Sequence, residues 1–544
     1  MASITSYWTL DSLIILIVSI IIAYFYMTRK FKYWKQRGVA EISPTPFTGN
    51  FTECALMKKA PGLLLHELHK QAKGEPYVGL FMFDKPFLLI RDPEVIKHIL
   101  VKNFNQFCNR YFIPNETDRL GYANLFFVNN PVWKMLKLKM TQAFTPNKLR
   151  KMVNLIDECA KNLVNYLDSM DLGDDGKIIN VKELCAKFTT DVIGSTAFGL
   201  NTNSFKHPDA EFCRYGNMIF SGPVRSFEIS MTVFMPTLSR LFGVTYFSKR
   251  IDAFFRKVFW ETMAERIESG ETRNDILDIL IKLKDEHGDE NIEGFKFDGD
   301  ELLAQAGIFF AAGYETSSTT MSFALYELAL NPEVQNRVRK EIFDTLIECD
   351  GKITYEMIMS LPYLEMVFLE VLRMYPPLEY LQRATTEVYN MPNSNLVLEK
   401  DTPIFISIRG LHYDPKYFPN PDKFDPERFN EENRRKRPVC VHLPFGDGPR
   451  GCIGSRMALV EMKLAFIKFL LNFEVTPCEK TLIPMKLDPM GSMTTPIGDA
   501  VHLNVQKINT GEELKRALYK ADRRRSSVFR LVYNNVAQYF NDRF

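Results

Sequence analysis

The stretch "FGDGPRGCIGSRMALVEM", residues 445–462, contains a single cysteine, Cys452, which lies between glycines just before an apolar, helix-like run. A thiol is a good ligand or nucleophile only as the thiolate, and the free N–H groups at a helix N-terminus lower its pKa. Glycines carry no Cβ, so the backbone here can approach the sulfur or a flat partner closely. A lone cysteine is more often inert packing, but flanking glycines and a preceding arginine pack poorly. The stretch therefore indicates a ligand site at Cys452.

Length and composition indicate one large folded body. The chain has 544 residues, of which 46% are hydrophobic and 25% charged, and no repeat or composition shift divides its middle. A net charge of +2 argues against a dedicated nucleic-acid binder, which usually carries a strongly basic domain. Nine cysteines without regular spacing are typical of reduced thiols in a reducing compartment. We therefore expect the body of the protein to face the cytosol.

The N-terminus has the pattern of a membrane anchor. Residues 8–27 read WTLDSLIILIVSIIIAYFYM, close to the roughly 20 apolar residues that span a bilayer. Basic residues follow this run, which places the N-terminus in the lumen and the body in the cytosol; a cleaved signal peptide fits less well, because no small-residue cleavage site is evident. We expect a transmembrane signal-anchor helix over residues 1–28. A basic, proline-rich linker is expected over residues 29–50, as a stiff spacer before the body.

The periodicity of the body predicts a mainly α fold with small β-sheets. Apolar residues recur at helical spacing over residues 152–170, 249–268, 301–330, 332–347 and 355–374. The stretch 395–410 is typical of two short strands that pair with each other. Residues 231–247 are more apolar than a surface connection needs, which predicts either a segment that dips into the membrane or an ordinary buried helix pair.

Within 445–454, six positions are similar in order and spacing to the haem-binding loop of the cytochrome P450 haem-thiolate monooxygenases. These positions are Phe445, Gly446, Gly448, Arg450, Cys452 and Gly454. The resemblance implies a single haem domain with the cytochrome P450 fold over residues 51–505. It also implies that Cys452 is the axial ligand of the haem iron, that Phe445 shields the sulfur, that Gly446 lies against the cofactor and that Arg450 pairs with a haem propionate.

Other stretches resemble the same family. "LEVLRMYPP" places Glu370 and Arg373 on one helical face, and "FDPERF" adds Arg428. The resemblance implies that these three residues lock the core behind the haem. Taken singly, Glu370 and Arg373 would be a surface pair that contributes under about 1 kcal/mol.

The resemblance also implies further contacts to the haem propionates. Trp133 and Lys137 in "VWKMLK" are similar to a helix that holds a propionate, although many relatives have arginine where Lys137 stands. Arg383 in "YLQRAT" and Arg110 in "FCNRYF" are further candidates, and an exposed surface position is the alternative for Arg110.

The stretch "FFAAGYETSSTT", residues 309–320, resembles the oxygen-activation helix of the family. The resemblance implies that Ala312 leaves room for dioxygen at the cofactor and that Glu315 and Thr316 relay protons. The substrate pocket is expected to use aromatic and apolar side chains that fit a core equally well. These are Tyr111, Phe112, Phe126, Phe127, Phe309, Phe310 and Leu378.

The resemblance implies a monooxygenase that inserts one oxygen atom from dioxygen into an apolar small molecule, such as a xenobiotic, plant toxin, insecticide or endogenous lipid. The cofactor would be haem b, and electrons would come from NADPH through NADPH-cytochrome reductase, with cytochrome b5 as a second donor. The protein would be a single-pass protein of the endoplasmic reticulum membrane that binds no nucleic acid. The alternatives are a haem-thiolate isomerase or dehydratase that acts on peroxides and a non-catalytic haem-binding sensor.

Two other features bear on partners and boundaries. Basic residues on the segment that resembles the proximal-face helix, and others before the haem loop, are expected to attract an acidic reductase. They are Lys134, Lys137, Lys139, Lys148, Arg150, Lys151, Arg434, Arg435, Lys436 and Arg437. Several motifs, including "FTPNKLR" at 144–150, resemble the insect microsomal xenobiotic-metabolising branch, from which residues 506–544 depart. We expect a solvated tail or a faulty gene model there, with a membrane-surface helix built on the apolar residues between 528 and 540 as the alternative.

Overall fold

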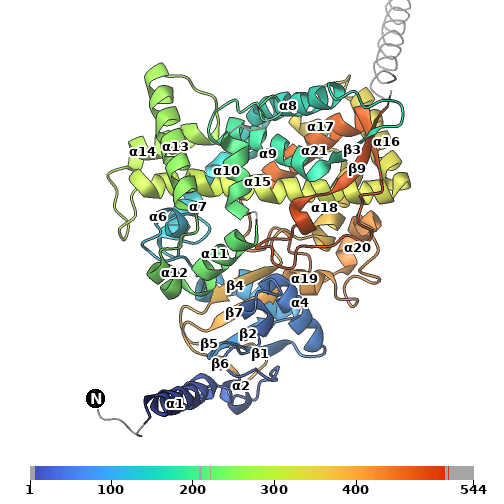
Figure 1. Cartoon of the computed structure of the whole chain (residues 1–544). Helices are drawn as coiled ribbons and strands as arrows, with labels where there is room; N and C mark the ends of the chain where they lie inside the picture. The colour runs from blue at the N-terminus through green and yellow to red at the C-terminus, as the bar shows by residue number, and fades with distance from the viewer. Residues whose placement is uncertain (1–6, 208–210, 221, 509–512, 514–544) are drawn as a thin grey trace, which may run out of the picture.

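The computed structural model describes residues 7–207, 211–220, 222–508 and 513. It is mainly α-helical with small sheets, as predicted, and Figure 1 shows the helices massed on one side of a sheet that lies next to the N-terminal helix. The helices of the first half are α1 (Trp8–Thr28), α2 (Tyr33–Gln36), α3 (Thr52–Ala55), α4 (Pro61–Gln71), α5 (Pro93–Lys97), α6 (Arg119–Tyr122), α7 (Val132–Thr141), α8 (Pro146–Asp168), α9 (Val181–Ala197), α10 (Glu211–Phe220), α11 (Pro223–Phe234), α12 (Pro236–Phe242) and α13 (Lys249–Ser269).

The second half of the chain supplies most of the helices around the predicted site. They are α14 (Ile276–His287), α15 (Gly299–Leu330), α16 (Pro332–Glu348), α17 (Tyr355–Met359), α18 (Pro362–Met374), α19 (Ile408–His412), α20 (Glu431–Lys436) and α21 (Ser455–Asn472). The helices predicted over 249–268, 301–330 and 332–347 are confirmed, and the one predicted over 152–170 begins earlier, at Pro146. The helix predicted over 355–374 is two helices, because Pro362 has no N–H to continue α17 and instead begins α18.

Three small sheets accompany the helices. Their strands are β1 (Tyr77–Met82), β2 (Lys85–Ile90), β3 (Lys177–Asn180), β4 (Tyr380–Ala384), β5 (Tyr389–Asn390), β6 (Val397–Leu398), β7 (Pro403–Ser407), β8 (Phe473–Thr476) and β9 (His502–Lys507). The strand orders are β1-β2-β7-β4, β3-β9-β8 and β5-β6. The pairing predicted within 395–410 is wrong, because β6 pairs with β5 while β7 lies between β2 and β4. All five residues of β7 are buried, so this strand needs a partner on each side.

The long helix α15 crosses the middle of the helical body and packs against α9 (Figure 1). It is 32 residues long and is buried along nearly its whole length. A helix that is apolar all round is typical of a core position. Away from its two ends, the exceptions are Phe309, Ala312, Gly313 and Thr316, whose surfaces are not fully covered by protein atoms. These uncovered residues mark a cavity beside the helix.

The segment 29–50, predicted as a spacer, packs against the sheet instead. Trp34 in α2 is completely buried, and its Nε1 donates a hydrogen bond to the carbonyl oxygen of Leu80 in β1 (3.1 Å). A Cβ on Gly79 would lie 2.3 Å from the Trp34 ring, so this glycine makes room for the tryptophan. The segment therefore belongs to the folded body, because it carries an aromatic side chain that the core of the sheet takes up.

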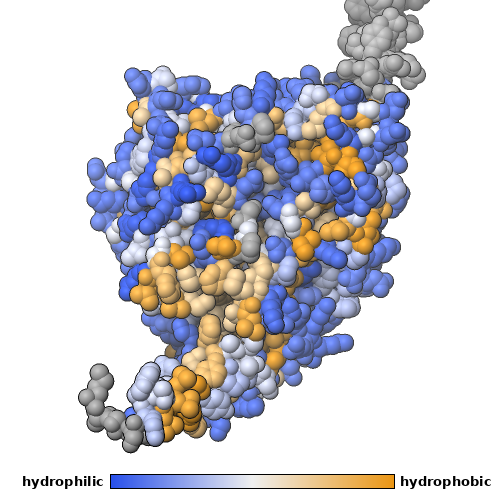
Figure 2. All heavy atoms as spheres, viewed as in Figure 1, coloured by the Kyte–Doolittle hydropathy of each residue, from blue (hydrophilic) through white to orange (hydrophobic). Residues whose placement is uncertain are grey.

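The helix α1 and the pair α11–α12 expose apolar side chains. Helix α1 has no buried residue, and the span Trp8–Gln36 is the one helix in the described part of the chain that is long and apolar enough to cross a membrane. In the stretch 231–247, Leu241 is 76% exposed and Phe242 69%, whereas Tyr246 and Phe247 are buried. Figure 2 shows hydrophobic atoms over α11 and α12 on the face from which α1 extends. Neither prediction for this stretch describes all of it, since its middle is exposed and its end is core.

At the C-terminal end of the body, β9 pairs with β3 and β8 and ends at Lys507. The predicted domain boundary at residue 505 therefore falls two residues before the end of a strand. The predicted amphipathic face between residues 528 and 540 lies outside the described residues.

Candidate active site

The loop before α21 is folded tightly around its glycines. Gly446 and Gly448 have φ angles of 68° and 69°, which favour glycine, and a Cβ on Gly448 would lie 1.9 Å from the carbonyl oxygen of Leu100. The N–H of Cys452 donates to the carbonyl of Phe445 (2.8 Å), and the N–H of Gly451 donates to that of Gly448 (2.9 Å). The loop therefore holds Cys452 in one place, at the start of α21.

The Cys452 thiol opens into an internal cavity. The accessible surface of the Cys452 side chain faces this cavity and not the outside of the protein. Burial raises the pKa of the thiol, while hydrogen bonds from the N–H groups of Gly454 and Ser455 and the charge of Lys137 lower it. A metal bound to the sulfur would deprotonate it outright. Burial outweighs these groups, so the pKa of the free thiol is raised overall, and a bound metal would be what makes Cys452 a thiolate ligand.

The cavity has a volume of about 280 Å³ and brings together most of the predicted site residues. Those that line it are Arg110, Phe126, Trp133, Lys137, Phe309, Ala312, Thr316, Leu378, Phe445, Gly446, Arg450 and Cys452. These residues come from five separate parts of the sequence. Most of the remaining wall is apolar, with Ser317, Thr320 and Glu461 as additional polar groups.

Three arginines lie close together here: Arg110 and Arg450 line the cavity, and Arg383, which does not line it, is near enough to lower the pKa of both. Arg450 donates to the carbonyls of Cys108 (2.5 Å) and Val128 (2.9 Å), and its guanidinium lies 4.4 Å from the centre of the Trp133 ring. Its Nη1 is buried and has no hydrogen-bond partner among the described residues. Burial, together with the nearby Arg383, lowers the pKa of Arg450 to about 9. The Nη1 donor of Arg450 is therefore available to bind an anion.

Arg383 and Arg110 complete the group. Arg383 on β4 is buried and donates to the carbonyl of Gln382 (2.8 Å), whereas its Nε has no hydrogen-bond partner in the part of the chain that the structure describes. Burial lowers the pKa of Arg383 to about 10. Arg110 donates to the carbonyl of Phe126 (2.7 Å), and burial followed by the charges of Arg383 and Arg450 lowers its pKa well below the usual range. Among the described residues no carboxylate pairs with any of the three. Buried cations without counter-charges are costly, so the group fits a ligand with negative charges.

Lys137 holds the loop itself. Its Nζ donates to the carbonyls of Pro449 and Gly451, the latter at 2.7 Å, and burial, with the nearby arginines, lowers its pKa to about 8. The lysine therefore bonds the loop backbone on either side of Arg450. Its predicted contact with a propionate stays a prediction.

The cavity fits an iron porphyrin. Such a group presents a metal centre, which a thiolate at Cys452 can ligate, and two carboxylates, which the unpaired donors of Arg383 and Arg450 can bind. The apolar remainder of the wall suits the porphyrin faces and an apolar substrate.

On α15, Ala312, Gly313 and Thr316 face the cavity, and Glu315 does not. The Thr316 hydroxyl donates to the carbonyl of Ala312 (2.6 Å). Glu315 is buried behind the helix, where its Oε1 lies 3.0 Å from the Nζ of Lys182 on α9. Successive residues of a helix differ by about 100° in direction, so two neighbours need not share a face. The structure thus places Thr316 and Cys452 at the same cavity, and the acid role of Glu315 stays a prediction.

The predicted pocket aromatics divide between the cavity and the core. Phe126, Phe309 and Leu378 line the cavity, whereas Phe112, Phe127 and Phe310 do not, and neither does Tyr111. Phe112 stacks with Phe87 and Phe405, Phe127 packs on Tyr246, and Phe310 packs among Phe198, Phe212, Phe255 and Tyr314. Phe127 and Phe310 belong to the core although they directly follow the lining residues Phe126 and Phe309, because adjacent residues of a turn or helix point in different directions.

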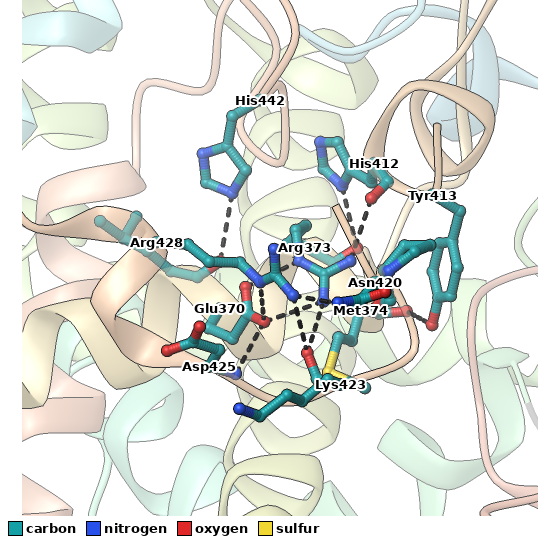
Figure 3. Close-up of polar contacts among 12 residues, drawn as sticks. Glu370, Arg373, Met374, His412, Tyr413, Asn420, Lys423, Asp425, Arg428 and His442 are labelled. Carbon is teal, nitrogen blue, oxygen red and sulfur yellow. Dashed lines mark hydrogen bonds and ion pairs between the residues drawn. The ribbon is translucent and has the colours of Figure 1, made fainter. Parts of the chain in front are cut away.

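Glu370, Arg373 and Arg428 form a buried ion-pair cluster (Figure 3). Arg373 donates to both oxygens of Glu370 (2.7 and 2.8 Å), and Arg428 donates to one of them (3.2 Å). Neither Glu370 nor Arg373 has any exposed side-chain surface, so the alternative of a surface pair is wrong. A buried bidentate pair of this kind is costly to break.

A further residue, His412, joins this cluster to the cysteine loop. Arg373 donates to the carbonyl of His412 (3.0 Å), and the N–H of Leu443 donates to the His412 Nε2 (3.0 Å). The carbonyl of Leu443 in turn accepts from the N–H of Gly446 (2.9 Å). Burial lowers the pKa of His412, which keeps the acceptor nitrogen unprotonated. The sequence contains no local signal for this connection, since His412 lies in a short helix far from the loop.

Comparison with known proteins agrees with these features. The sequence profile described as Cytochrome P450 matches residues 40–503. Cytochrome P450 6k1 of Blattella germanica is 43% identical to the chain over 509 residues, which cover 91% of this chain and 96% of that protein. Probable cytochrome P450 6g2 of Drosophila melanogaster is 40% identical, with coverage of 91% and 98%. Cytochrome P450 6j1 of Blattella germanica is 37% identical, with coverage of 92% and 99%.

Proposed function

Since the chain belongs to the cytochrome P450 family and is a P450 monooxygenase, we propose that it oxidises apolar xenobiotics or endogenous lipids with electrons from NADPH. The electrons would arrive through NADPH-cytochrome reductase, with cytochrome b5 as a second donor, and the cofactor would be haem b. The observation that carries this proposal is the shared cavity of Cys452 and Thr316, which is enclosed mainly by apolar side chains. When bound there, an iron porphyrin with a thiolate ligand activates dioxygen and supplies one oxygen atom to the substrate.

The residues of the chain prepare this chemistry. Cys452 would ligate the iron, and Arg383 and Arg450 would bind the propionates with buried donors that have no other partner among the described residues, with Arg110 beside them. The hydroxyl of Thr316 lies at the cavity wall and passes protons to the oxygen site through cavity water. The apolar side chains Phe126, Phe309 and Leu378 select apolar substrates and keep other water out.

We also propose that the protein is anchored in the endoplasmic reticulum membrane with its haem domain in the cytosol. Helix α1 is apolar and is followed directly by basic residues, of which Arg29 pairs with Asp84 (3.0 Å). The exposed apolar side chains of α11 and α12, on the face from which α1 extends, suit the same bilayer (Figure 2).

Reconstitution tests the proposed reaction. The purified protein is loaded with haem, combined with NADPH-cytochrome reductase in lipid vesicles, and supplied with a panel of plant toxins, insecticides and fatty acids. A monooxygenase forms oxygenated products only with NADPH and reductase, a peroxide isomerase or dehydratase acts on lipid hydroperoxides without them, and a haem sensor does neither. Cys452→Ser serves as the control, because an alcohol is a weaker donor than a thiolate and the thiolate-type carbon monoxide spectrum should be lost.

A further inference from the structure

The turn between α18 and β4 supplies part of the cavity wall, and hydrogen bonds from outside the cavity hold this turn. Pro377 and Leu378 line the cavity, and Leu378 is 37% exposed. The N–H of Thr494 donates to the carbonyl of Pro377 (3.1 Å), and the Thr494 hydroxyl donates to the carbonyl of Pro376 (2.5 Å). Thr494 is buried and does not line the cavity. It therefore holds the wall from outside, at the two residues before Leu378.

On the other side of Leu378, Glu379 forms an ion pair with Arg409 on α19. The Nη1 of Arg409 donates to the Oε1 of Glu379 (3.3 Å), and the N–H of Arg409 donates to the carbonyl of Glu379 (3.1 Å). Arg409 directly follows Ile408, which also lines the cavity, so each member of the pair is the chain neighbour of a lining residue. The pairing of β4 with β7 ends next to them. The ion pair thus holds the two wall segments together where the sheet no longer does.

Glu379 is enclosed by other elements as well. Its side chain is 8% exposed, and a Cβ on Gly62 of α4 would lie 2.1 Å from its Oε2. Burial raises the pKa of Glu379, whereas the charge of Arg409 and a hydrogen bond with Thr494 lower it in part. The Nε of Arg409 is also buried, without a hydrogen-bond partner in the part of the chain that the structure describes. Losing either side chain would leave its partner buried and unpaired, which is costly.

We propose that Glu379, Arg409 and Thr494 are positioning residues for substrate selection, which hold Leu378 and Ile408 in one arrangement at the cavity wall. The inference rests on the proposed monooxygenase function and adds to it the residues that decide which carbon of a substrate is oxidised. None of the three lines the cavity, so they act through the neighbours that do. Because protein interiors are close-packed, a side chain behind a cavity wall fixes the position of the wall in front of it.

Binding of two azoles to the haem-loaded enzyme tests this role. Imidazole is small and reaches only the iron, whereas clotrimazole is bulky enough to press on the cavity wall. In Glu379→Gln and in Arg409→Gln the ion pair is lost, so the wall can shift. Affinity for clotrimazole relative to imidazole should then fall about 5-fold, which is less than the roughly 10-fold that one methylene decides in an apolar pocket. The double variant should show no larger change than either single variant, because the two residues act together.

Arg339→Gln is the matched control. The Arg339 side chain is 12% exposed, as that of Arg409 is, and it pairs with Glu474 (3.8 Å) without lining the cavity. Its loss should leave the azole ratio unchanged even if the melting temperature falls. Thr494→Val keeps the shape of the side chain and loses the hydroxyl that holds Pro376, so it should lower the azole ratio even where the variants of the ion pair do not fold.

Laurate supplies a second readout with NADPH and reductase, because its chain offers many similar carbons. In Thr494→Val and in the two variants of the ion pair, the ratio of the two main hydroxylated products should change about 3-fold. An azole ratio or a product ratio that stays unchanged in all three variants, or an equal change in Arg339→Gln, overturns the proposal. If the parent enzyme oxidises no compound of the panel, the monooxygenase proposal fails instead, and the azole ratio still decides whether these residues shape the cavity.

Discussion

At the scale of single residues, a variant of Thr316 can distinguish a chemical role of this side chain from a structural one. Its hydroxyl faces the cavity and also donates to the carbonyl of Ala312 within α15. Thr316→Ala should keep the helix, because alanine is the better helix former. The variant should bind haem and consume NADPH but release more peroxide and less oxygenated product, measured together on one preparation. A lower melting temperature with unchanged coupling would show that Thr316 only shapes the helix.

Arg383 allows a test of the cation group. Its buried guanidinium has one donor bonded to a neighbouring carbonyl and an unpartnered Nε. A charge-assisted hydrogen bond contributes about 1.5–3 kcal/mol, so Arg383→Met should speed haem loss about 10- to 100-fold. Transfer of haem to an excess of an apo-globin measures the rate. Arg337→Met is the control, since that arginine is exposed and pairs with Glu427; equal rates in the two variants would contradict a propionate role for Arg383.

The roles of single residues were predictable where the residues that act together are also close together in the sequence. Cys452, Gly446, Gly448 and Arg450 lie within a few positions of one another, and the structure places all four in one loop. The contact between Glu461 and Ser317 at the cavity was missed because the two residues lie 144 positions apart in the sequence. The only local signal was a carboxylate within the apolar run of α21.

At the scale of elements, α15 carries a second buried acid that links helix packing to pH. Glu327 accepts a hydrogen bond from the hydroxyl of Tyr375 (2.7 Å), and burial raises its pKa from the ordinary 4.5 to about 7. Between these values the folded state holds a proton that the unfolded state has released. Stability is therefore complete below about pH 4.5 and is lost as the pH rises through 7.

Glu327→Gln should remove this loss. The free energy of unfolding of the parent protein should fall between about pH 5 and pH 7 by up to about 1.4 kcal/mol per pH unit, and that of the variant should fall less steeply. Denaturant unfolding at several pH values measures the difference. The exposed Glu348 provides the control, and an equal slope in Glu327→Gln and Glu348→Gln would show that Glu327 titrates normally.

Elements were predictable where their own periodicity is strong. The helices α13, α15 and α16 follow from apolar spacing alone. The break before Pro362 could have been predicted from that one residue, because a proline cannot continue a helix. The position of β7 between β2 and β4 was not predictable, because parallel pairing across more than 300 residues leaves no local pattern.

At the scale of the whole molecule, the basic residues expected to meet a reductase are not equally available. Lys139 lies 2.6 Å from His287, Arg150 pairs with Glu356, and Lys436 pairs with Glu432. Lys134 and Arg434 are exposed and have no acidic partner among the described residues. Lys151 is also exposed without an acidic partner, but it donates to the side-chain oxygen of Asn274 (3.2 Å), so Lys134 and Arg434 are the pair to test.

Reversing both charges should slow the reduction of the haem iron by the reductase. We expect about a tenfold loss at low ionic strength for Lys134→Glu with Arg434→Glu, and a weaker dependence of the rate on salt. Stopped-flow reduction across a salt series measures both. Lys249→Glu with Arg250→Glu changes the same number of exposed charges outside the predicted surface. If the two double variants behave alike, the reductase docks elsewhere.

The structure also sets how far the haem domain can move from its anchor. Only residues 29–33 separate the end of α1 at Thr28 from Trp34, which is locked under β1. Five residues span at most about 18 Å when fully extended. With α1 in a bilayer, the connecting segment 29–33 is too short to let the haem domain rotate freely above the membrane surface. It drifts in two dimensions at a fixed height, and a reductase or substrate in the same lipid sheet meets it in one narrow range of orientations.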